Sequence, residues 1–395
     1  MKVSRRSAVP PFAVMEVLAA VGERRDAGLP VFSLCAGEPG GGAPADVNEL
    51  AAELLRSGAD LGYTAALGVP ALRQSVARHY DRWYGLSVDP AQVAITTGSS
   101  GAFVLAFLAA FEPGDRVALA RPGYPAYRNI LSSLGCEVVD IPCGADTRYQ
   151  PTPQLLDAAV ADGGPLAGLI LASPANPTGT MVDRDELAAL VAWCSDAGVR
   201  LVSDEIYHGI TYGDDTGACA WEFGPDPIIV SSFSKYWGMT GWRLGWALLP
   251  EDLVAPVDAL AGNLALCPPV LSQHAAVAAF TPDSYAAAQA AVERYRDHRS
   301  LVLGRLPELG WGKFAPADGA FYVYAEIAEQ ITSAGVANCV EWCKRLLEET
   351  GVALTPGTDF DAVGGAEWVR LSFAADREVI EQGLDRLSAW SLRSG

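Results

Sequence analysis

Short apolar runs and amphipathic stretches alternate along the first 280 residues of the chain. The apolar runs are rich in β-branched residues, which is typical of buried strands of a parallel sheet. These predicted strands cover residues 92–97, 115–120, 168–172, 199–203 and 228–232. Apolar residues at helical spacing predict helices at 14–25, 102–111 and 185–197. The alternation indicates an α/β fold with a mostly parallel central sheet.

After residue 282 the pattern changes. A long helix is predicted at 283–306, followed by strands near 314–324, 351–355 and 368–372 and by a closing amphipathic helix at 377–390. A chain of 395 residues exceeds one hydrophobic core. We therefore expect a large domain of residues 41–282 and a small α+β domain formed by residues 1–40 and 283–395.

Composition and charge exclude several classes of protein. The net charge of −19 argues against nucleic acid or an anionic membrane as a partner. The longest apolar run, 101–111, is shorter than the ~20 residues that span a bilayer. Pro10 and Pro11 stand where a signal peptide needs an apolar run, so we expect a soluble cytoplasmic protein. The eight cysteines form no Cys-x-x-Cys pair, and neither a metal site nor a disulfide framework is expected.

The stretch 228–246 contains the clearest candidate chemistry. Its apolar start is followed by Ser232, Ser234 and Lys235, and Arg243 comes eight residues after the lysine. A single lysine is usually a solvated surface charge. An amine held in an apolar pocket beside another cation, however, has a lowered pKa and becomes a nucleophile toward carbonyl groups. Lys235 is therefore a candidate for a lysine that forms a Schiff base.

Other polar residues follow the predicted strands directly. Asp204 ends one strand, and a carboxylate at the carboxyl edge of an α/β sheet is well placed for ligand contact, although a helix cap is the commoner role. The segment 98–101, Gly-Ser-Ser-Gly, joins a strand to a helix and has the pattern of a phosphate-binding turn. It does not fit the Gly-x-Ser-x-Gly elbow of serine hydrolases, because Gly101 comes one residue too early.

The segment 232–235, Ser-Phe-Ser-Lys, together with Arg243 resembles the cofactor-lysine motif of the class I aminotransferases. These enzymes, the aspartate aminotransferase family, depend on pyridoxal 5′-phosphate (PLP). The resemblance extends in order from Gly37 to Arg370 and so covers nearly the whole chain. It implies the PLP-dependent transferase fold type I, with a mostly parallel central sheet in a large domain plus a smaller α+β domain, and it implies a homodimer.

The resemblance assigns most candidate residues to the cofactor. Lys235 would form the Schiff base and carry the proton, Asp204 would hold the pyridine nitrogen, and Tyr207 would bond the phenolic oxygen. The remaining implied cofactor contacts are Ser99, Ser100, Gly101, Ser232 and Arg243 at the phosphate, Tyr124 on the ring, Asn176 at the phenolic oxygen, and Tyr63 at the phosphate in the partner subunit. Gly37, Asn176 and Arg370 would contact the substrate, with Arg370 binding its α-carboxylate in bidentate geometry.

The resemblance implies transfer of an amino group between an L-amino acid and a 2-oxo acid by a ping-pong mechanism. The segments 10–14 and 261–270 contain no cation for a second carboxylate, which favours a neutral or aliphatic donor such as alanine or valine. An aspartate aminotransferase and a PLP-dependent β-lyase of the same fold stay open as alternatives. A transcription regulator would need a DNA-binding domain before Gly37, where about 36 residues are too few. A scaffold protein would not account for Lys235, Asp204 and Arg370 together.

Overall fold

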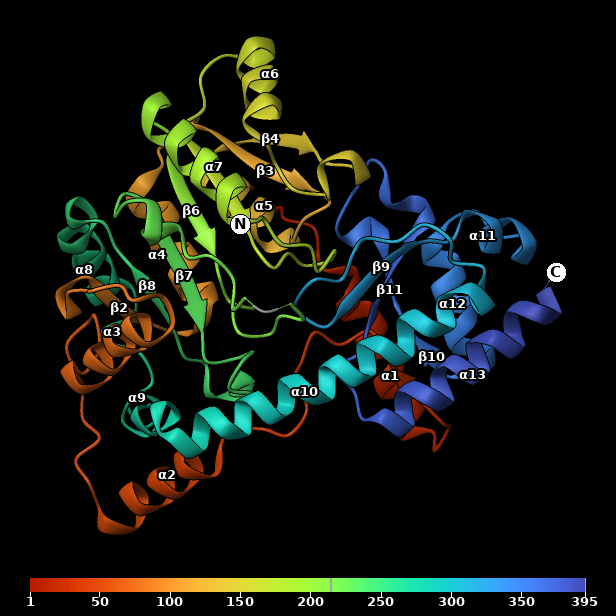
Figure 1. Ribbon diagram of the computed structural model, residues 1–395, viewed down its shortest axis with the longest axis horizontal. Helices are drawn as coiled ribbons and strands as arrows, with labels where there is room; N and C mark the ends of the chain where they lie inside the picture. The colour runs from red at the N-terminus through yellow and green to blue at the C-terminus, as the bar shows by residue number, and fades with distance from the viewer. Residues whose placement is uncertain (214, 395) are drawn as a thin grey trace.

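A seven-stranded sheet forms the centre of the larger part of the molecule (Figure 1). The computed structural model describes residues 1–213 and 215–394, with backbone alone for 392–394. The strand order is β2-β8-β7-β6-β5-β3-β4, and all neighbours are parallel except β8, which is antiparallel to β2 and β7. The strands are β2 (Val93–Thr96), β3 (Arg116–Arg121), β4 (Glu137–Pro142), β5 (Gly168–Ala172), β6 (Arg200–Asp204), β7 (Ile228–Ser232) and β8 (Gly245–Leu248).

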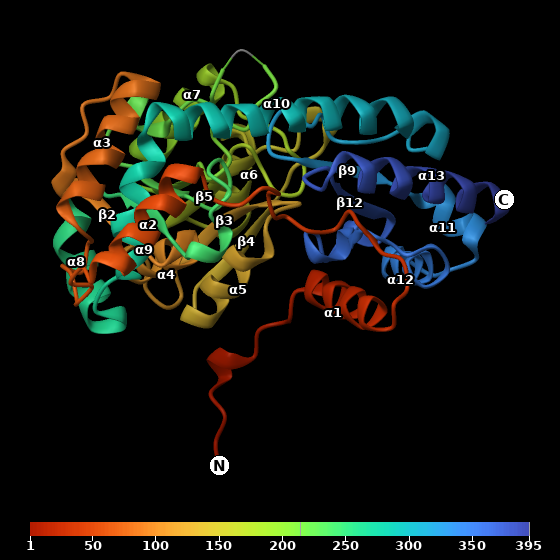
Figure 2. The same cartoon turned by 90° about the horizontal axis from the view of Figure 1, so that it is seen from below.

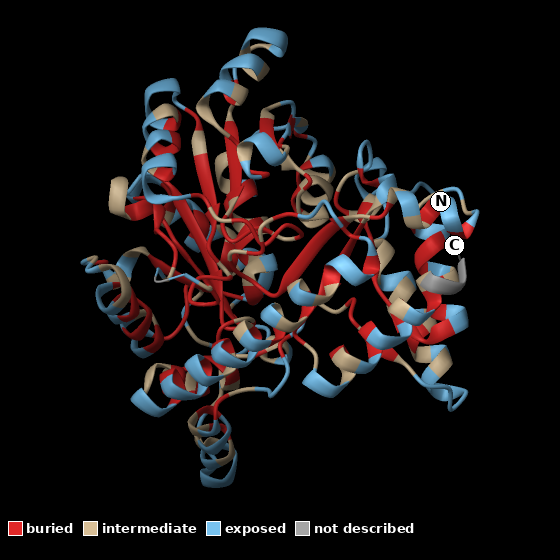
Figure 3. Cartoon of the chain, turned by 45° about the vertical axis from the view of Figure 1, so that its right-hand side comes forward, coloured by how far each residue is buried: buried red, intermediate tan, exposed pale blue. Residues whose placement is uncertain are grey.

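Both faces of this sheet are buried, which explains its nearly continuous apolar strands. Ile228 and Val230 of β7 pack into one core cluster, whereas Ile229 points to the opposite face and joins another. Figure 3 shows the buried strands enclosed by helices whose outer surfaces are exposed. The helices that follow the sheet strands or flank them are α2 (Ala45–Ser57), α3 (Pro70–Tyr84), α4 (Gly98–Ala110), α5 (Pro125–Leu134), α6 (Pro153–Gly163), α7 (Arg184–Ala197), α8 (Glu251–Ala265) and α9 (Val270–Ala276).

Two small sheets form the second part of the molecule. In one, β1 (Phe32–Ser33) pairs in parallel with β10 (Val352–Ala353), so residues near the two ends of the chain lie side by side. In the other, β12 (Trp368–Ser372) lies between β11 (Thr355–Pro356) and β9 (Tyr322–Glu326), antiparallel to both. The helices of this part are α1 (Ala13–Asp26), α11 (Ala328–Ala334), α12 (Cys339–Thr350) and α13 (Arg377–Ser394).

The long helix α10 (Pro282–Arg305) runs from the seven-stranded sheet to the small sheets (Figure 1). The N-terminal tip of the chain projects away from the body of the molecule (Figure 2), whereas the carbonyl oxygen of Pro10 accepts a hydrogen bond from Asn129 of α5. Among the described helices, none combines the length and the apolar character needed to cross a membrane.

The structure differs from the expected elements at three places. The predicted turn 98–101 lies inside the first turn of α4, because the helix already begins at Gly98. The strand predicted near 314–324 is shorter: β9 begins at Tyr322, and Phe314 forms only an isolated bridge to Ala325. The strand predicted at 351–355 is divided into β10 and β11, which pair with different sheets.

Candidate active site

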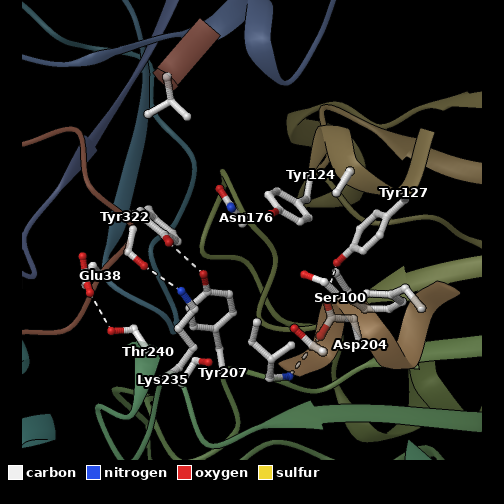
Figure 4. A pocket seen from close by; sticks show the side chains of 18 of the residues that line it. Glu38, Ser100, Tyr124, Tyr127, Asn176, Asp204, Tyr207, Lys235, Thr240 and Tyr322 are labelled. Carbon is white, nitrogen blue, oxygen red and sulfur yellow. Dashed lines mark hydrogen bonds between the residues drawn. The ribbon is translucent and has the colours of Figure 1, made fainter. Parts of the chain in front are cut away.

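A cavity of about 390 Å³ lies at the carboxyl ends of the parallel strands, where the small sheets meet the large one. Ligand sites of open α/β sheets are commonly found at this edge. The side chains that sequence reasoning assigned to a cofactor or substrate converge here from many elements (Figure 4). The predicted residues that line the cavity are Gly37, Ser99, Ser100, Tyr124, Asn176, Asp204, Tyr207, Lys235, Arg243 and Arg370.

Lys235 projects into the cavity from the turn that follows β7. Its Nζ donates a hydrogen bond of 2.6 Å to the carbonyl oxygen of Gly37. Burial and the nearby Arg370 lower the pKa of Lys235 to about 8, although Glu38 and Asp204 act in the opposite direction. A substantial fraction of the amine is therefore neutral at mildly alkaline pH, which is the form that attacks carbonyl carbons.

Asp204 stands at the end of β6 and is 5 % exposed. One carboxylate oxygen accepts a hydrogen bond from the Tyr127 hydroxyl, and the other accepts the Ile206 amide at 3.1 Å. Burial raises the pKa of Asp204 to about 7, opposed by these two hydrogen bonds and by the charge of Lys235. Asp204 is thus a buried acid whose ionised form would be stabilised by a proton donor in the cavity.

The start of α4 forms a candidate anion site. The first amides of a helix lack partners within the helix and lie at the positive end of its dipole. Ser99 and Ser100 lie in this first turn, and a Cβ added to Gly98 would come within 2.6 Å of Arg243 Nη2. Gly245 of β8 allows the close approach of the strand to this turn, since its added Cβ would lie 2.7 Å from the Ser99 nitrogen. Helix start, two hydroxyls and a guanidinium fit a phosphate group.

Arg370 is a buried cation whose hydrogen bonds within the described residues go to neutral oxygens and not to a carboxylate. Its Nη1 donates to Asn176 Oδ1 at 2.8 Å, and its Nη2 donates to the Cys35 carbonyl at 2.7 Å. Its Nε has no hydrogen-bond partner within the described part of the chain. A buried charge without a counterion is costly, so this arrangement fits an anionic group entering from the cavity.

Two predicted aromatic residues line the cavity from different elements. Tyr124 is the N-cap residue of α5 and stacks on Phe12, with ring centroids 6.2 Å apart. Tyr207 follows β6, and its hydroxyl lies 2.7 Å from the hydroxyl of Tyr322. The Nζ of Lys235 is 5.7 Å from the centroid of the Tyr207 ring.

Three predicted residues do not line the cavity. Ser232 is buried behind the cavity, and its hydroxyl donates a hydrogen bond of 2.8 Å to the Ser234 hydroxyl. Of these two serines, Ser234 is the one that lines the cavity. The Gly101 amide already donates to the Thr97 carbonyl at 3.3 Å within the first turn of α4. Tyr63 is 84 % exposed and lies outside the cavity of its own chain.

Sequence reasoning assigned no cofactor or substrate contact to several polar residues of the cavity, namely Glu38, Tyr127, Ser234, Thr240 and Tyr322. Tyr127 could have been found, because it lies three residues after Tyr124 and therefore on the same side of the first turn of α5. Tyr322 gives no such signal, since it comes from a strand of the second part of the molecule, more than 80 residues after Lys235.

Comparison with known proteins identifies the family. Residues 30–387 match the family described as aminotransferase class I and II. The chain is 52 % identical over 390 residues to the valine–pyruvate aminotransferase of Mycobacterium tuberculosis, covering 98 % of each protein.

Solved structures agree with this assignment. An aminotransferase from M. tuberculosis superposes with a TM-score of 0.95 at 50 % identity over 100 % of both chains. The aspartate aminotransferase of Thermus thermophilus with maleate gives 0.91 at 31 % identity, covering 98 % of this chain and 99 % of that one. The chain therefore belongs to the class I and II aminotransferases, which are PLP-dependent enzymes of fold type I.

The donor set of the cavity fits PLP. The start of α4 with Arg243 suits the phosphate, the buried acid Asp204 suits a ring nitrogen, and the amine of Lys235 suits the aldehyde carbon. Arg370 is left as an unpaired cation for a second anionic molecule. The cavity thus provides for a cofactor and for a carboxylate substrate together.

Proposed function

We propose that this enzyme takes the amino group of a neutral aliphatic L-amino acid, such as valine or alanine, and delivers it to a 2-oxo acid such as pyruvate. The observation that carries the proposal is the charge of the cavity wall. Among the described residues that line the cavity, the cations are Lys235, Arg243 and Arg370. Each has a proposed partner: Lys235 the cofactor aldehyde, Arg243 the cofactor phosphate and Arg370 the α-carboxylate of the donor. A second substrate carboxylate would have no cation, and its burial would be unfavourable.

One part of the cavity wall is apolar. Val14 and Leu18 come from α1, and Ala126 and Ile130 come from α5. An isopropyl or methyl side chain buried here would gain roughly 0.8 kcal/mol for each methylene-sized group. The name of the valine–pyruvate aminotransferase, 52 % identical to this chain, supports the same class of donor and acceptor.

We assign the cofactor contacts as follows. Ser99, Ser100, Ser234 and Arg243 would bind the phosphate, with Ser232 and Gly101 shaping the site from behind. Asp204 would hold the ring nitrogen, Tyr124 would lie against the ring, and Asn176 and Tyr207 would bond the phenolic oxygen. When bound, PLP supplies a ring system that accepts the electron pair released at the donor α-carbon.

The residues of the chain then have distinct tasks. Arg370 binds the donor carboxylate through two parallel hydrogen bonds and so orients the α-hydrogen. Lys235 Nζ, with its pKa near 8, removes the α-proton of the donor and later returns a proton as general acid. Asp204, ionised, keeps the ring nitrogen protonated. The 2-oxo acid formed from the donor leaves before the acceptor 2-oxo acid enters, which gives ping-pong kinetics.

We also propose the domain division, the assembly and the location. A large domain of residues 41–282 and a small domain of residues 1–40 and 283–395 agree with the separate sheets and with the start of α10 at Pro282. A homodimer is supported by the exposed Tyr63, which would reach the partner's cofactor phosphate. A cytoplasmic location is in keeping with the acidic composition and the free thiols of all eight cysteines.

A steady-state assay with PLP-loaded protein tests the donor class. Valine or alanine with a suitable 2-oxo acid should give parallel double-reciprocal lines, and aspartate should give a kcat/KM at least about tenfold lower. A higher kcat/KM with aspartate than with valine would restore the aspartate aminotransferase alternative. Ammonia and pyruvate release from β-chloroalanine, without amino transfer from valine, would favour a β-lyase.

The apolar wall can be tested with a matched pair of variants. Leu18→Ala should raise KM for valine more than KM for alanine, because the longer side chain loses more contact. Val17→Ala is the control, since Val17 is partly buried on the same helix and packs against the same core cluster as Leu18 but does not line the cavity. Equal effects of the two variants on valine would contradict the assigned wall.

A further inference from the structure

Tyr322 contacts residues from both halves of the cavity, although nothing in the sequence assigns it a role. It opens β9 in the second part of the molecule and is 1 % exposed. Its hydroxyl lies 2.7 Å from that of Tyr207, which follows strand β6 of the seven-stranded sheet (Figure 4). Its ring lies beneath the Arg370 guanidinium, with 4.4 Å between Cζ and the ring centroid.

The hydroxyl of Tyr322 is the partner that fixes the hydroxyl of Tyr207. Each of the two hydroxyls carries one proton. When the Tyr207 hydroxyl donates its proton to another oxygen, the hydrogen bond between the two tyrosines must be donated by Tyr322. A hydroxyl that accepts a hydrogen bond is polarised and becomes a stronger donor itself. The same Tyr322 oxygen lies 2.5 Å from where a Cβ of Gly37 would stand, and the Gly37 carbonyl accepts the Lys235 amine.

The ring of Tyr322 has a different contact. The Arg370 guanidinium lies between the rings of Tyr322 and Phe360, at 4.4 and 4.8 Å from their centroids. Hydrogen bonds to Asn176 and to the Cys35 carbonyl fix the ends of the guanidinium, whereas the two rings fix the tilt of its plane. That tilt decides whether both parallel hydrogen bonds reach a carboxylate.

We propose that Tyr322 is a positioning residue with two separable tasks: its hydroxyl orients Tyr207 toward the cofactor, and its ring orients Arg370 toward the donor carboxylate. The proposal rests on the proposed function, because it requires these roles of Tyr207 and Arg370. It also links the two parts of the molecule, since Tyr322 and Arg370 lie on β9 and β12 whereas Tyr207 follows β6.

Two substitutions separate the tasks in the PLP-loaded enzyme. Tyr322→Phe removes the hydroxyl and keeps the ring, whereas Tyr322→Leu removes both. Tyr324→Phe is the matched control, because Tyr324 is a buried tyrosine two residues along the same strand that does not line the cavity. One readout is the pH midpoint of the visible absorbance of the bound cofactor. The other is the dissociation constant of isovalerate, a carboxylate with the valine side chain and no amino group.

The pH midpoint of the cofactor absorbance should rise by about half a pH unit in both Tyr322 variants, because the Tyr207 hydroxyl becomes a weaker hydrogen-bond donor to the cofactor. Charged groups near Tyr207 that also affect it are Asp204, Lys235 and Arg370, and all three are unchanged in the variants. Isovalerate binding should stay within about twofold in Tyr322→Phe and weaken about fivefold in Tyr322→Leu, which loses the cation–π contact. Tyr324→Phe should match the wild type in both readouts.

Wild-type midpoints in both Tyr322 variants would overturn the role of the hydroxyl, and wild-type isovalerate affinity in Tyr322→Leu would overturn the role of the ring. Valine transamination by the wild type, measured in parallel, reports on the proposed function separately. Unchanged readouts in an enzyme that transaminates valine contradict the inference alone. The expected shifts in an enzyme that does not use valine support the inference and contradict only the donor class.

Discussion

At the scale of single residues, burial moves the pKa of the two principal groups of the cavity toward neutrality from opposite sides. The pKa of Lys235 is lowered to about 8 and that of Asp204 is raised to about 7, in each case mainly by burial. General acid–base catalysis is most effective when the pKa of the group lies near the working pH. The same burial costs stability, and the cost depends on pH.

Glu205, directly after Asp204, is buried without contributing to the cavity wall. Its Oε1 accepts the Ala220 amide at 2.9 Å and the Ser203 hydroxyl at 3.1 Å. Its Oε2 lies 3.6 Å from His208 Nδ1 and has no hydrogen bond within the described residues. Burial raises the pKa of Glu205 to about 8. In the unfolded chain this carboxyl loses its proton near pH 4.5. Between pH 4.5 and about 8 the folded state therefore binds more protons than the unfolded state, and the free energy of unfolding falls as the pH rises through this range.

Glu205→Gln should therefore stabilise the protein at pH 8 more than at pH 5. The amide oxygen can accept the same two hydrogen bonds, and the variant has no proton to lose. The expected gain in the free energy of unfolding is about 1–3 kcal/mol at pH 8 and close to zero at pH 5. Urea unfolding at the two pH values measures it. Glu137→Gln, on an exposed side chain, is the control, and a gain that did not depend on pH would contradict the account.

At the scale of elements, α1 is held over the cavity by a residue from the far end of the chain. Phe12, its N-cap residue, makes no side-chain cap hydrogen bond. The carboxylate of Asp359 instead accepts the Ala13 and Val14 amides at 2.9 and 3.4 Å. Because Val14 lines the cavity, this cap fixes part of the proposed donor site.

Removing this cap should weaken donor binding as well as stability. Asp359→Ala should cost about 1 kcal/mol of stability and raise KM for valine severalfold, because the first turn of α1 frays. Asp183→Ala is the matched control: Asp183 caps α7, where it accepts the Glu186 amide at 2.8 Å, and it does not line the cavity. Urea unfolding should show similar losses of stability in the two variants. Steady-state kinetics should show a raised KM for valine only in Asp359→Ala. A raised KM in both would contradict a specific role of Asp359.

How much could be predicted from the sequence also differs between elements. Five of the seven strands of the large sheet were predictable because they are largely buried apolar runs, and Asp204 ends one of them whereas Lys235 comes three residues after another. Strand β4, which is mostly not buried, and strand β8, which has no β-branched residue, were not predicted. A strand was predicted at 351–355, but its division into β10 and β11 on two different sheets was not, since strands of two residues carry no period. The Asp359 cap and the hydrogen bond between Tyr207 and Tyr322 join residues more than 100 positions apart, and no local pattern reports such pairs.

At the scale of the whole molecule, the cavity lies where the two sets of sheets meet. Arg370 comes from a small sheet, whereas Lys235 and Asp204 follow strands of the large one. A donor held by Arg370 and processed at Lys235 therefore contacts both parts.

The proposed dimer gives a prediction at the same scale. Light scattering should give twice the chain mass of 41.6 kDa. Tyr63→Phe should keep the dimer but lose PLP faster on dialysis, because one hydrogen bond to the partner's phosphate is missing. A monomer with full activity would contradict both the dimer and the role of Tyr63.

The central claim is that Lys235 moves the proton in amino transfer from an aliphatic donor, and absorbance during a single turnover tests it most directly. PLP-loaded wild-type protein mixed with valine, without a 2-oxo acid, should lose its visible band and release one 2-oxo acid per site. Lys235→Ala should fold, bind PLP more weakly and show no such release. Release of the 2-oxo acid by Lys235→Ala at the wild-type rate, or a wild type that stays unchanged with valine and alanine but reacts with aspartate, would contradict the account.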